Sequence, residues 1–218
     1  MRVILASASP RRKELLKNLF QNFEIIPATG DETYTKTHPP DIVQQLAAQK
    51  AAEIEQKLCG SCSADTSIST SSSTCTCTCT CTDQDYLIIA ADTIVVFDGT
   101  ILGKPHNKSH AAEMLHLLAG NVHQVYTGVA LILFTQGRRQ AIQFAECTHV
   151  RFYPMTEAEI EAYIESGEPM DKAGAYGIQG IGGRFVQGVE GDYQNVVGLP
   201  AAKLYQVFKK IKDFPLPF

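Results

Sequence analysis

The sequence predicts an α/β fold in which a mixed, twisted β-sheet is flanked by helices. Near-continuous apolar runs, typical of buried strands, occur at residues 3–6 and 86–97. Segments with helical periodicity alternate with such runs along the chain. Hairpin turn signals also join neighbouring strands, so we expect a mixed sheet and not a purely parallel one.

The chain begins with a predicted strand followed by a helix. Val3–Ala6 is the apolar run that predicts the strand. Ser9 suits the N-cap of the helix, and Pro10 suits its first position, where a missing N–H group costs nothing. Apolar residues at helical spacing extend this helix to Phe20. A second helix, rich in Ala, Gln, Lys and Glu, is predicted at residues 42–58.

A low-complexity segment of Ser, Thr and Cys occupies residues 59–85. It offers too little bulky apolar surface to offset the entropy of ordering, so we expect a disordered insertion in a single domain of residues 1–218. Its cysteines raise the alternative of a metal site. Zinc sites use well-spaced ligand pairs, whereas these cysteines form an unspaced ladder, so the metal site is disfavoured. An odd count of 7 cysteines without a secretory signal argues against a disulfide framework.

The second half of the chain combines strands, hairpins and helices. Tyr86–Phe97 is a predicted buried strand, and Asp98-Gly99 is a hairpin turn signal. Thr156 and Glu159 form a capping box that opens a helix. The other predicted elements are a helix at 109–119, strands at 124–134 and 140–152, glycine-rich loops and short strands at 174–198, and a last helix that starts at Pro200.

The overall composition excludes several classes of protein. The chain has 218 residues, of which 44% are hydrophobic and 19% charged, as in globular proteins. Its net charge of −4 argues against a nucleic-acid coat protein. The sequence has no apolar run of the length that spans a membrane. We therefore expect a cytoplasmic protein without nucleic-acid or membrane partners.

Two arginines in the first turn of the first helix predict an anion site. Arg11 and Arg12 lie at the positive end of the helix dipole, which favours anions by about 0.3–1 kcal/mol. Free N–H groups, the two guanidinium groups and the hydroxyls of Ser7 and Ser9 would together bind phosphates. The alternative is a pair of solvated surface arginines.

Asp92 and Lys104 are further candidates for chemistry. Asp92 interrupts the most apolar strand, where a carboxylate is costly unless it is paired or bound to a cation. It is either a structural residue or a metal ligand or general base. Lys104 lies between a glycine and a proline, which suits a lysine directed at a phosphate, although an exposed hairpin-end lysine has the same pattern. Asp171–Gly177 is typical of a substrate-binding loop.

These motifs, taken in order, resemble the signature of the Maf (septum-formation-like) family. The matching segments are residues 5–16, Ala91–Val95, Gly103–Pro105, Asp171–Gly180 and Asn195–Pro200. The Ser/Thr/Cys insertion departs from the family, in which a short loop connects the helix to the Asp-bearing strand. The resemblance implies an inosine-triphosphatase-like fold with an active-site cleft between two lobes.

The resemblance also implies an activity: hydrolysis of a nucleoside triphosphate to the monophosphate and pyrophosphate, assisted by Mg²⁺ or Mn²⁺. The loop at residues 175–180 is similar to that of the subgroup acting on dTTP and UTP. A homodimer is also compatible with the resemblance. The implied catalytic residues are Asp92, Glu32 and Lys104, the implied metal ligands are Asp92 and Glu32, and the implied substrate-binding residues are Ser7, Arg11, Arg12, Lys50, Thr93, Asp171, Lys172 and Gln179.

Residue chemistry is consistent with this activity. Arginine and lysine side chains would neutralise a polyphosphate, and two acids can divide the roles of metal ligand and general base. Which acid takes which role stays open at this stage. The alternative function is a nucleotide-binding regulatory protein of cell division with little turnover, which would have no need of Asp92.

Overall fold

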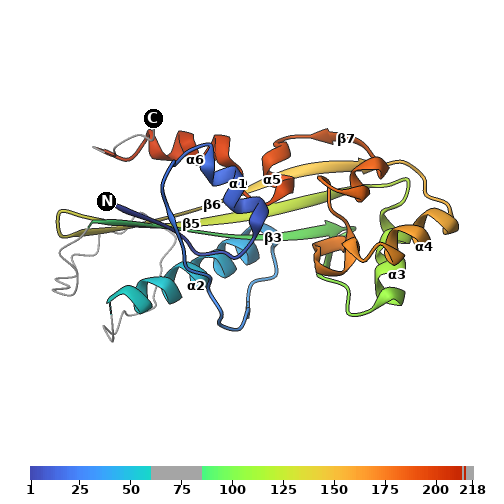
Figure 1. Cartoon of the computed structure of the whole chain (residues 1–218), viewed down its shortest axis with the longest axis horizontal. Coiled ribbons are helices and arrows are strands. Elements are labelled where there is room, and N and C mark those ends of the chain that lie inside the picture. Colours follow the sequence, from blue (N-terminus) through green and yellow to red (C-terminus); the bar gives the residue numbers. More distant parts are fainter. Residues whose placement is uncertain (60–84, 213, 215–218) are drawn as a thin grey trace.

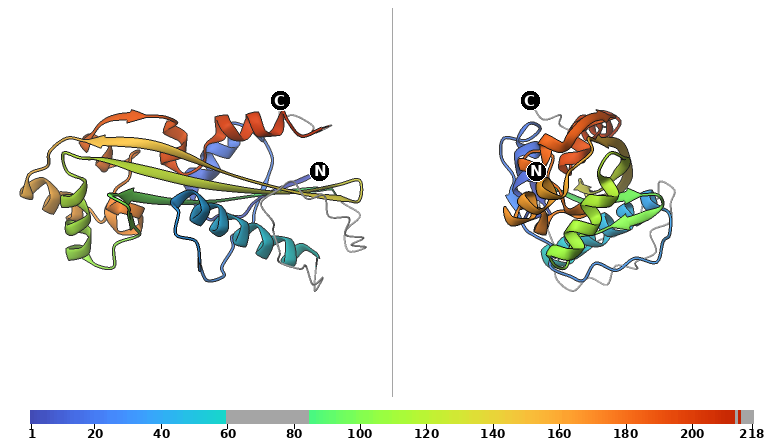
Figure 2. Two further views of the ribbon diagram at one scale, coloured as in Figure 1. Left: turned by 180° about the vertical axis from the view of Figure 1, so that it is seen from behind. Right: turned by 90° about the vertical axis from the view of Figure 1, so that its right-hand side faces the viewer.

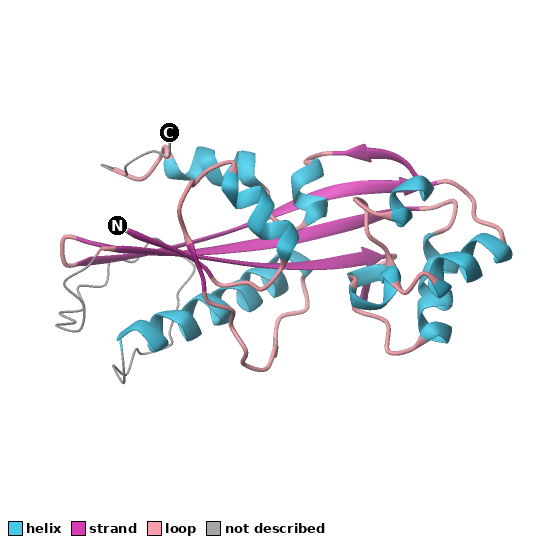
Figure 3. Ribbon diagram, viewed as in Figure 1, coloured by secondary structure: helices cyan, strands magenta, loops and turns pink. Residues whose placement is uncertain are grey.

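The computed structural model describes residues 1–59, 85–212 and 214, and its fold is the expected mixed α/β sheet (Figures 1 and 3). The described strands form a 7-stranded sheet in the order β2-β1-β3-β5-β6-β7, with β4 paired to β3 off this path. The strands are β1 (Arg2–Leu5), β2 (Glu24–Ile25), β3 (Tyr86–Phe97), β4 (Thr100–Leu102), β5 (Val122–Thr135), β6 (Arg138–Phe152) and β7 (Val186–Glu190).

Helices cover both faces of this sheet (Figure 2). The α-helices are α1 (Pro10–Lys17), α2 (Pro39–Cys59), α3 (Lys108–Leu118), α4 (Glu157–Glu165), α5 (Tyr193–Val197) and α6 (Ala201–Phe208). Three short 3₁₀ helices, η1 (Glu168–Asp171), η2 (Ala173–Ala175) and η3 (Ile181–Phe185), follow α4. No helix among the described residues is both long and apolar enough to cross a membrane.

Two hairpins of the sheet, β3–β4 and β5–β6, have turns with left-handed backbone. Asp98 and Gly99, between β3 and β4, have φ values of 47° and 75°. Gln136 and Gly137, between β5 and β6, have φ values of 50° and 72°. Two consecutive positive φ angles match the right-handed twist of the flanking strands, which explains why these dipeptides form hairpins.

One edge of β3 is open in the middle of the strand. The N-terminal part of β3 pairs in parallel with β1 over residues 86–89, and its C-terminal part pairs antiparallel with β4 over residues 95–97. Between these two partners, the segment from Ala90 to Ile94 pairs only with β5, on its other edge. Asp92 and Thr93 both lie in this unpaired segment.

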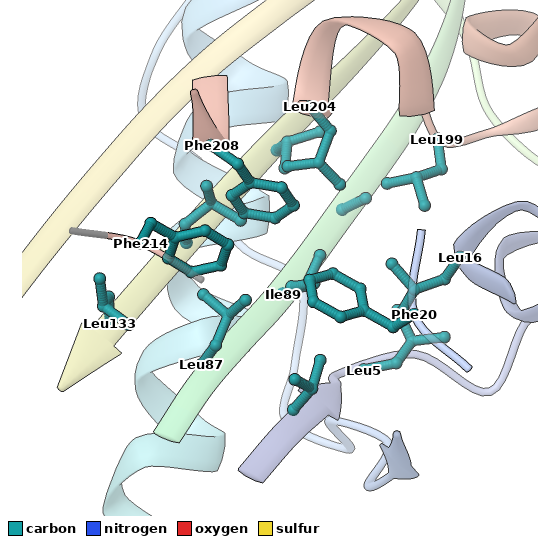
Figure 4. Close-up of a cluster of buried hydrophobic side chains, with 14 of the residues drawn as sticks. Leu5, Leu16, Phe20, Leu87, Ile89, Leu133, Leu199, Leu204, Phe208 and Phe214 are labelled. Atoms are coloured by element: carbon teal, nitrogen blue, oxygen red, sulfur yellow. The ribbon is translucent and has the colours of Figure 1, made fainter. Parts of the chain in front are cut away.

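The two faces of β3 pack against different helices. Ile88 and Ala90 pack in one cluster with Ala47, Ala51 and Ile54 of α2. Leu87, Ile89 and Ala91 face the opposite cluster, which includes residues of α1, α6 and the C-terminal segment (Figure 4). Because successive side chains of a strand alternate between faces, Asp92 lies on the α2 face and Thr93 on the other.

A separate cluster covers the far end of the sheet. It packs α3, α4 and the 3₁₀ segments against the C-terminal part of β3, with Leu115, Phe152, Tyr163 and Tyr176 among its buried residues. The long strands β3, β5 and β6 extend from the α2 end of the molecule to this end (Figure 1). The sheet therefore carries hydrophobic clusters at both ends.

Several element boundaries differ from the sequence predictions. Helix α1 ends at Lys17, before the predicted Phe20, although Phe20 is buried against Phe208. Asn107, and not a residue near 109, is the N-cap of α3, and its side chain accepts a hydrogen bond from the His110 amide. Helix α5, within the segment predicted as loops and short strands, was missed. The predicted insertion at 59–85 lies almost entirely outside the described residues, and both it and the single domain stay predictions.

Candidate active site

Lys50 joins the two acids that the sequence analysis selected. Its Nζ atom lies 2.5 Å from Asp92 Oδ1 and 2.7 Å from Glu32 Oε1. The Lys50 and Asp92 side chains are only 16% and 10% exposed, whereas Glu32 is 59% exposed. The hydrogen bond from Lys50 lowers the pKa of Glu32, and the charges of Lys50, Lys104 and Arg12 act in the same direction. The Lys50 ammonium group thus lies between a buried carboxylate on β3 and an exposed carboxylate.

A glycine on the neighbouring strand brings α2 close enough for this contact. Gly128 of β5 is the cross-strand partner of Asp92. A Cβ atom at Gly128 would lie 2.3 Å from the carbonyl carbon and oxygen of Val43 in α2, so only glycine permits this approach. Lys50 follows Val43 by two helical turns and therefore shares its face of α2.

Arg12 connects three separate segments on the opposite side of β3. Its Nε atom donates to the Gly198 carbonyl at 2.8 Å, and its two terminal nitrogens donate to Ser7 Oγ at 3.2 Å and Thr93 Oγ1 at 3.0 Å. Burial is the main cause that lowers the pKa of Arg12, and the charge of Asp92 opposes it. Gly198, with a φ of 122°, lets the backbone pass beside this guanidinium.

A buried polar network begins at Thr93 and crosses the sheet. Thr93 Oγ1 lies 3.0 Å from Thr127 Oγ1, and Thr127 donates to the Asn195 carbonyl at 2.9 Å. The Asn195 side-chain amide donates to the Val125 carbonyl and to Thr148 Oγ1. Thr127, Thr148 and Asn195 are completely buried. The network holds α5 against β5 and β6, next to the site.

Arg11 and Lys104 are the cations of the site that stay available. Within the described residues neither side chain makes a hydrogen bond or an ion pair that would occupy it. Lys104 follows β4, and the carbonyl of the preceding Gly103 accepts a hydrogen bond from the Gly174 amide. This bond ties the Lys104 segment to the loop that carries Asp171 and Lys172.

Asp171 and Lys172 contact each other beside this loop. Burial raises the pKa of Asp171, but the hydrogen bond from Lys172 and the charges of Lys172 and Arg11 outweigh it, so the net shift is downward. The bond of Arg12 to the Gly198 carbonyl and the bond of the Gly174 amide to the Gly103 carbonyl join predicted segments from both ends of the chain.

Glu168 and Tyr163 shape the glycine-rich loop, and the sequence analysis missed both. The Glu168 carboxylate accepts hydrogen bonds from the Ile181 and Gly182 amides at 2.8 and 3.1 Å, and from the Tyr163 hydroxyl at 2.9 Å. A Cβ atom at Gly180 would lie 2.3 Å from this carboxylate, which explains the glycine there. Gln179, at the tip of the loop, is exposed.

The donor set fits a divalent cation that is shared with a substrate. Asp92 and Glu32 offer two carboxylates, already bridged by the Lys50 ammonium group. Among the described residues there is no group of three or more His, Cys, Asp or Glu residues that could hold a metal. Mg²⁺ commonly uses one or two carboxylates and completes its shell with substrate phosphates and water. Two carboxylates therefore suffice if phosphates supply the remaining ligands.

Comparison with known proteins shows the family of the chain. A family model described as "Maf-like protein" matches residues 2–211, which include every candidate site residue. The chain belongs to this family. A "dTTP/UTP pyrophosphatase" of Agathobacter rectalis is 44% identical to this Maf-like chain over 210 residues, covering 96% of the chain and 97% of that protein. Proteins with the same name from Bacillus thuringiensis subsp. konkukian and Bacillus cereus (strain B4264) are 44% and 43% identical over 96% of the chain and 95% of their own length.

Proposed function

We propose that this Maf-like chain is a nucleoside triphosphate pyrophosphatase that acts on dTTP and UTP. The names of its relatives support this activity and substrate class. The observation that carries the proposal is the contact of Lys50 with both Asp92 and Glu32, beside the open edge of β3. Such a site combines a base for water with cations for phosphate, which is what cleavage of a phosphoric anhydride requires.

In this reaction a water molecule attacks one phosphorus atom and the P–O bond to the departing pyrophosphate breaks. In this proposal Asp92 orients the water and accepts its proton. Lys50 holds the Asp92 carboxylate in position, because its ammonium group also binds Glu32. Arg11 and Lys104 would neutralise the triphosphate, as positioned cations stabilise the charge that develops in phosphoryl transfer.

We further propose that Mg²⁺ or Mn²⁺ assists the reaction. Asp92 and Glu32 would hold the cation together with phosphate oxygens, and the cation would supply charge neutralisation. Arg12 has a different role in this proposal, because its three hydrogen bonds go to protein acceptors. It organises Ser7, Thr93 and the Gly198 backbone around the substrate.

The test is product analysis with dTTP, UTP, CTP, GTP and 7-methyl-GTP in the presence of Mg²⁺ or Mn²⁺. We expect release of pyrophosphate and the nucleoside monophosphate, with the highest kcat/KM for dTTP or UTP. Preference for 7-methyl-GTP would retain the chemistry and overturn the substrate class. If nothing is released although nucleotides bind, the alternative of a nucleotide-binding regulatory protein is correct.

The Asp92→Asn variant tests the catalytic assignment. Asparagine keeps the size of the side chain but cannot accept the proton of water, so we expect kcat to fall by about 10²–10⁴-fold. The same product assay measures the effect, and circular dichroism checks the fold. An unchanged kcat would exclude Asp92 as the base.

Cytoplasmic location and a homodimer stay predictions.

A further inference from the structure

The loop that carries Glu32 has no regular secondary structure of its own. Residues 26–38, between β2 and α2, form neither helix nor strand, and the Glu32 side chain is 59% exposed. A loop of this kind is held in place by the hydrogen bonds that its backbone makes to other parts of the protein. Those bonds therefore decide where the Glu32 carboxylate lies.

Two side chains of α2 bind the backbone of this loop at separate points. The Glu53 carboxylate accepts hydrogen bonds from the Thr29 amide at 2.9 Å and from the Gly30 amide at 3.0 Å. The side-chain amide of Gln49 donates to the Thr33 carbonyl at 2.7 Å. Both contacts join a side chain of the helix to main-chain groups of the loop, so they fix the path of the loop and not only its side chains.

The two attachment points lie on either side of Glu32 along the chain. Gln49 and Glu53 are four residues apart, which places them on one face of α2, and Lys50 lies between them in the sequence. Glu32 Oε1 lies 2.7 Å from Lys50 Nζ. We infer that Gln49 and Glu53 are positioning residues that tie the loop to α2 on both sides of Glu32 and so hold its carboxylate against Lys50.

The effect on catalysis rests on the proposed function, in which Glu32 and Asp92 together hold Mg²⁺. If the loop leaves α2, one of these two carboxylates leaves the site, whereas Asp92 can still accept the proton of the attacking water. Loss of one attachment point should therefore raise the Mg²⁺ concentration at half-maximal rate more than it lowers kcat at saturating Mg²⁺.

Trypsin cleavage after Lys36 measures the attachment of the loop independently of activity. Lys36 is exposed and lies in this loop, and residues 60–84 contain neither Lys nor Arg, so they offer trypsin no competing site. The Gln49→Met variant keeps an unbranched side chain but cannot donate to Thr33. We expect cleavage after Lys36 to become about fivefold faster, the size expected for one hydrogen bond. An unchanged cleavage rate would overturn the inference.

The matched control is Gln44→Met, since the Gln44 amide donates to the Pro40 carbonyl within α2 itself. This variant should keep the cleavage rate and the Mg²⁺ dependence of the wild type. Within the described residues the buried Gln49 Oε1 atom has no hydrogen-bond partner, so methionine there removes an unpaired acceptor and should change Tm little. If Gln49→Met does not fold, Glu53→Gln gives the same comparison, because its NH₂ group cannot accept from a loop amide.

A double-variant cycle with Glu32→Gln tests whether Gln49 acts through Glu32. Gln49→Met alone should raise the half-maximal Mg²⁺ concentration about fivefold. The combined variant should need no more Mg²⁺ than Glu32→Gln alone, because a positioning residue has no effect once the residue that it positions is removed. Additive effects would overturn the inference. A wild type that releases no pyrophosphate from dTTP would contradict the proposed function, and the trypsin comparison would still decide the attachment of the loop.

Discussion

At the scale of single residues, the site depends on one ammonium group between two carboxylates. Asp92 lies in an apolar strand, where an unpaired carboxylate is costly. Lys50 reduces that cost through a direct contact, and its bond to Glu32 links the buried acid to an exposed one. The three side chains come from a strand, a helix and a loop, so they meet only in the folded chain.

Replacing Lys50 with methionine should therefore affect both activity and stability. Breaking a buried ion pair by removing one partner typically costs about 3–5 kcal/mol. We expect kcat to fall and Tm to drop, and we expect Mg²⁺ to raise Tm more in Lys50→Met than in the wild type, because a cation then replaces the ammonium group. Differential scanning fluorimetry with EDTA or Mg²⁺ measures this.

The control for this experiment is Lys57→Met, since Lys57 pairs with Glu53 on the same helix at an exposed position. Exposed i,i+4 pairs contribute about 0.3–0.5 kcal/mol, so this variant should behave nearly as the wild type. Equal Tm values for the two variants would contradict the structural role of Lys50.

At the scale of elements, the close packing of α2 on β5 positions the reactive groups. The helix backbone at Val43 approaches Gly128 more closely than any side chain would allow. Gly128 is the cross-strand partner of Asp92, so α2 approaches the sheet most closely beside Asp92. Glu53, near the end of α2, accepts the Thr29 and Gly30 amides, which connects the loop that carries Glu32 to the same helix.

The Gly128→Ala variant should displace α2. A methyl group 2.3 Å from a backbone carbonyl cannot be accommodated unless the helix moves. Overpacking typically costs about 1–3 kcal/mol. We expect a lower Tm and a weaker kcat, because Lys50 moves with the helix. Gly188→Ala is the matched control, since a Cβ atom there meets nothing within 4 Å. Equal decreases of Tm and kcat in Gly128→Ala and Gly188→Ala would exclude the packing explanation.

At the scale of the whole molecule, a titratable group lies in the hydrophobic cluster that packs α3 and α4 against the sheet. His123 is completely buried and its Nε2 lies 2.8 Å from the Tyr176 hydroxyl. Both rings contact Phe152 edge-on. Burial lowers the pKa of His123 from 6.5 to about 4, so the folded protein holds this imidazole neutral at neutral pH. The unfolded chain binds the proton more readily.

The stability of the protein should therefore fall in mild acid. The folded pKa lies below the unfolded value, so the contribution of His123 is complete above pH 6.5 and is lost as the pH decreases toward 4. Thermal unfolding between pH 7.5 and 4.5 should show this loss, and the double variant His123→Leu/Tyr176→Phe should show a flatter profile. Glu53, with a pKa of about 2, contributes a separate loss below pH 4.5. If Tm fell equally with pH in the wild type and in the double variant, the role of His123 would be contradicted.

Local sequence patterns predicted the elements better than they predicted the site. Ser9 and Pro10 identified the start of α1, because helix capping depends on neighbouring residues. Asp92 was recognisable as a charge in an apolar strand. Lys50 had no such local signal, since lysine is ordinary in a helix rich in Lys and Glu, and only the family resemblance selected it.

The supporting residues of the site could not be found from sequence in the same way. Thr127 is one threonine in a strand, a common placement, and its importance comes from its contacts with Thr93 and Asn195. Gly128 and Glu168 likewise act through segments that are distant in the sequence. Buried hydrogen bonds and close backbone contacts of this kind depend on tertiary packing, which single-sequence periodicity does not encode.

The open edge of β3 also has a consequence for how the molecule unfolds. β1 and β4 leave a gap on that edge, but β3, β5 and β6 pass the gap without interruption. The hydrophobic clusters at the two ends of the sheet are therefore joined by shared backbone, and neither end can melt without disrupting the strands of the other. We expect the protein to unfold in one cooperative transition, and we expect bound nucleotide to raise the Tm of that transition.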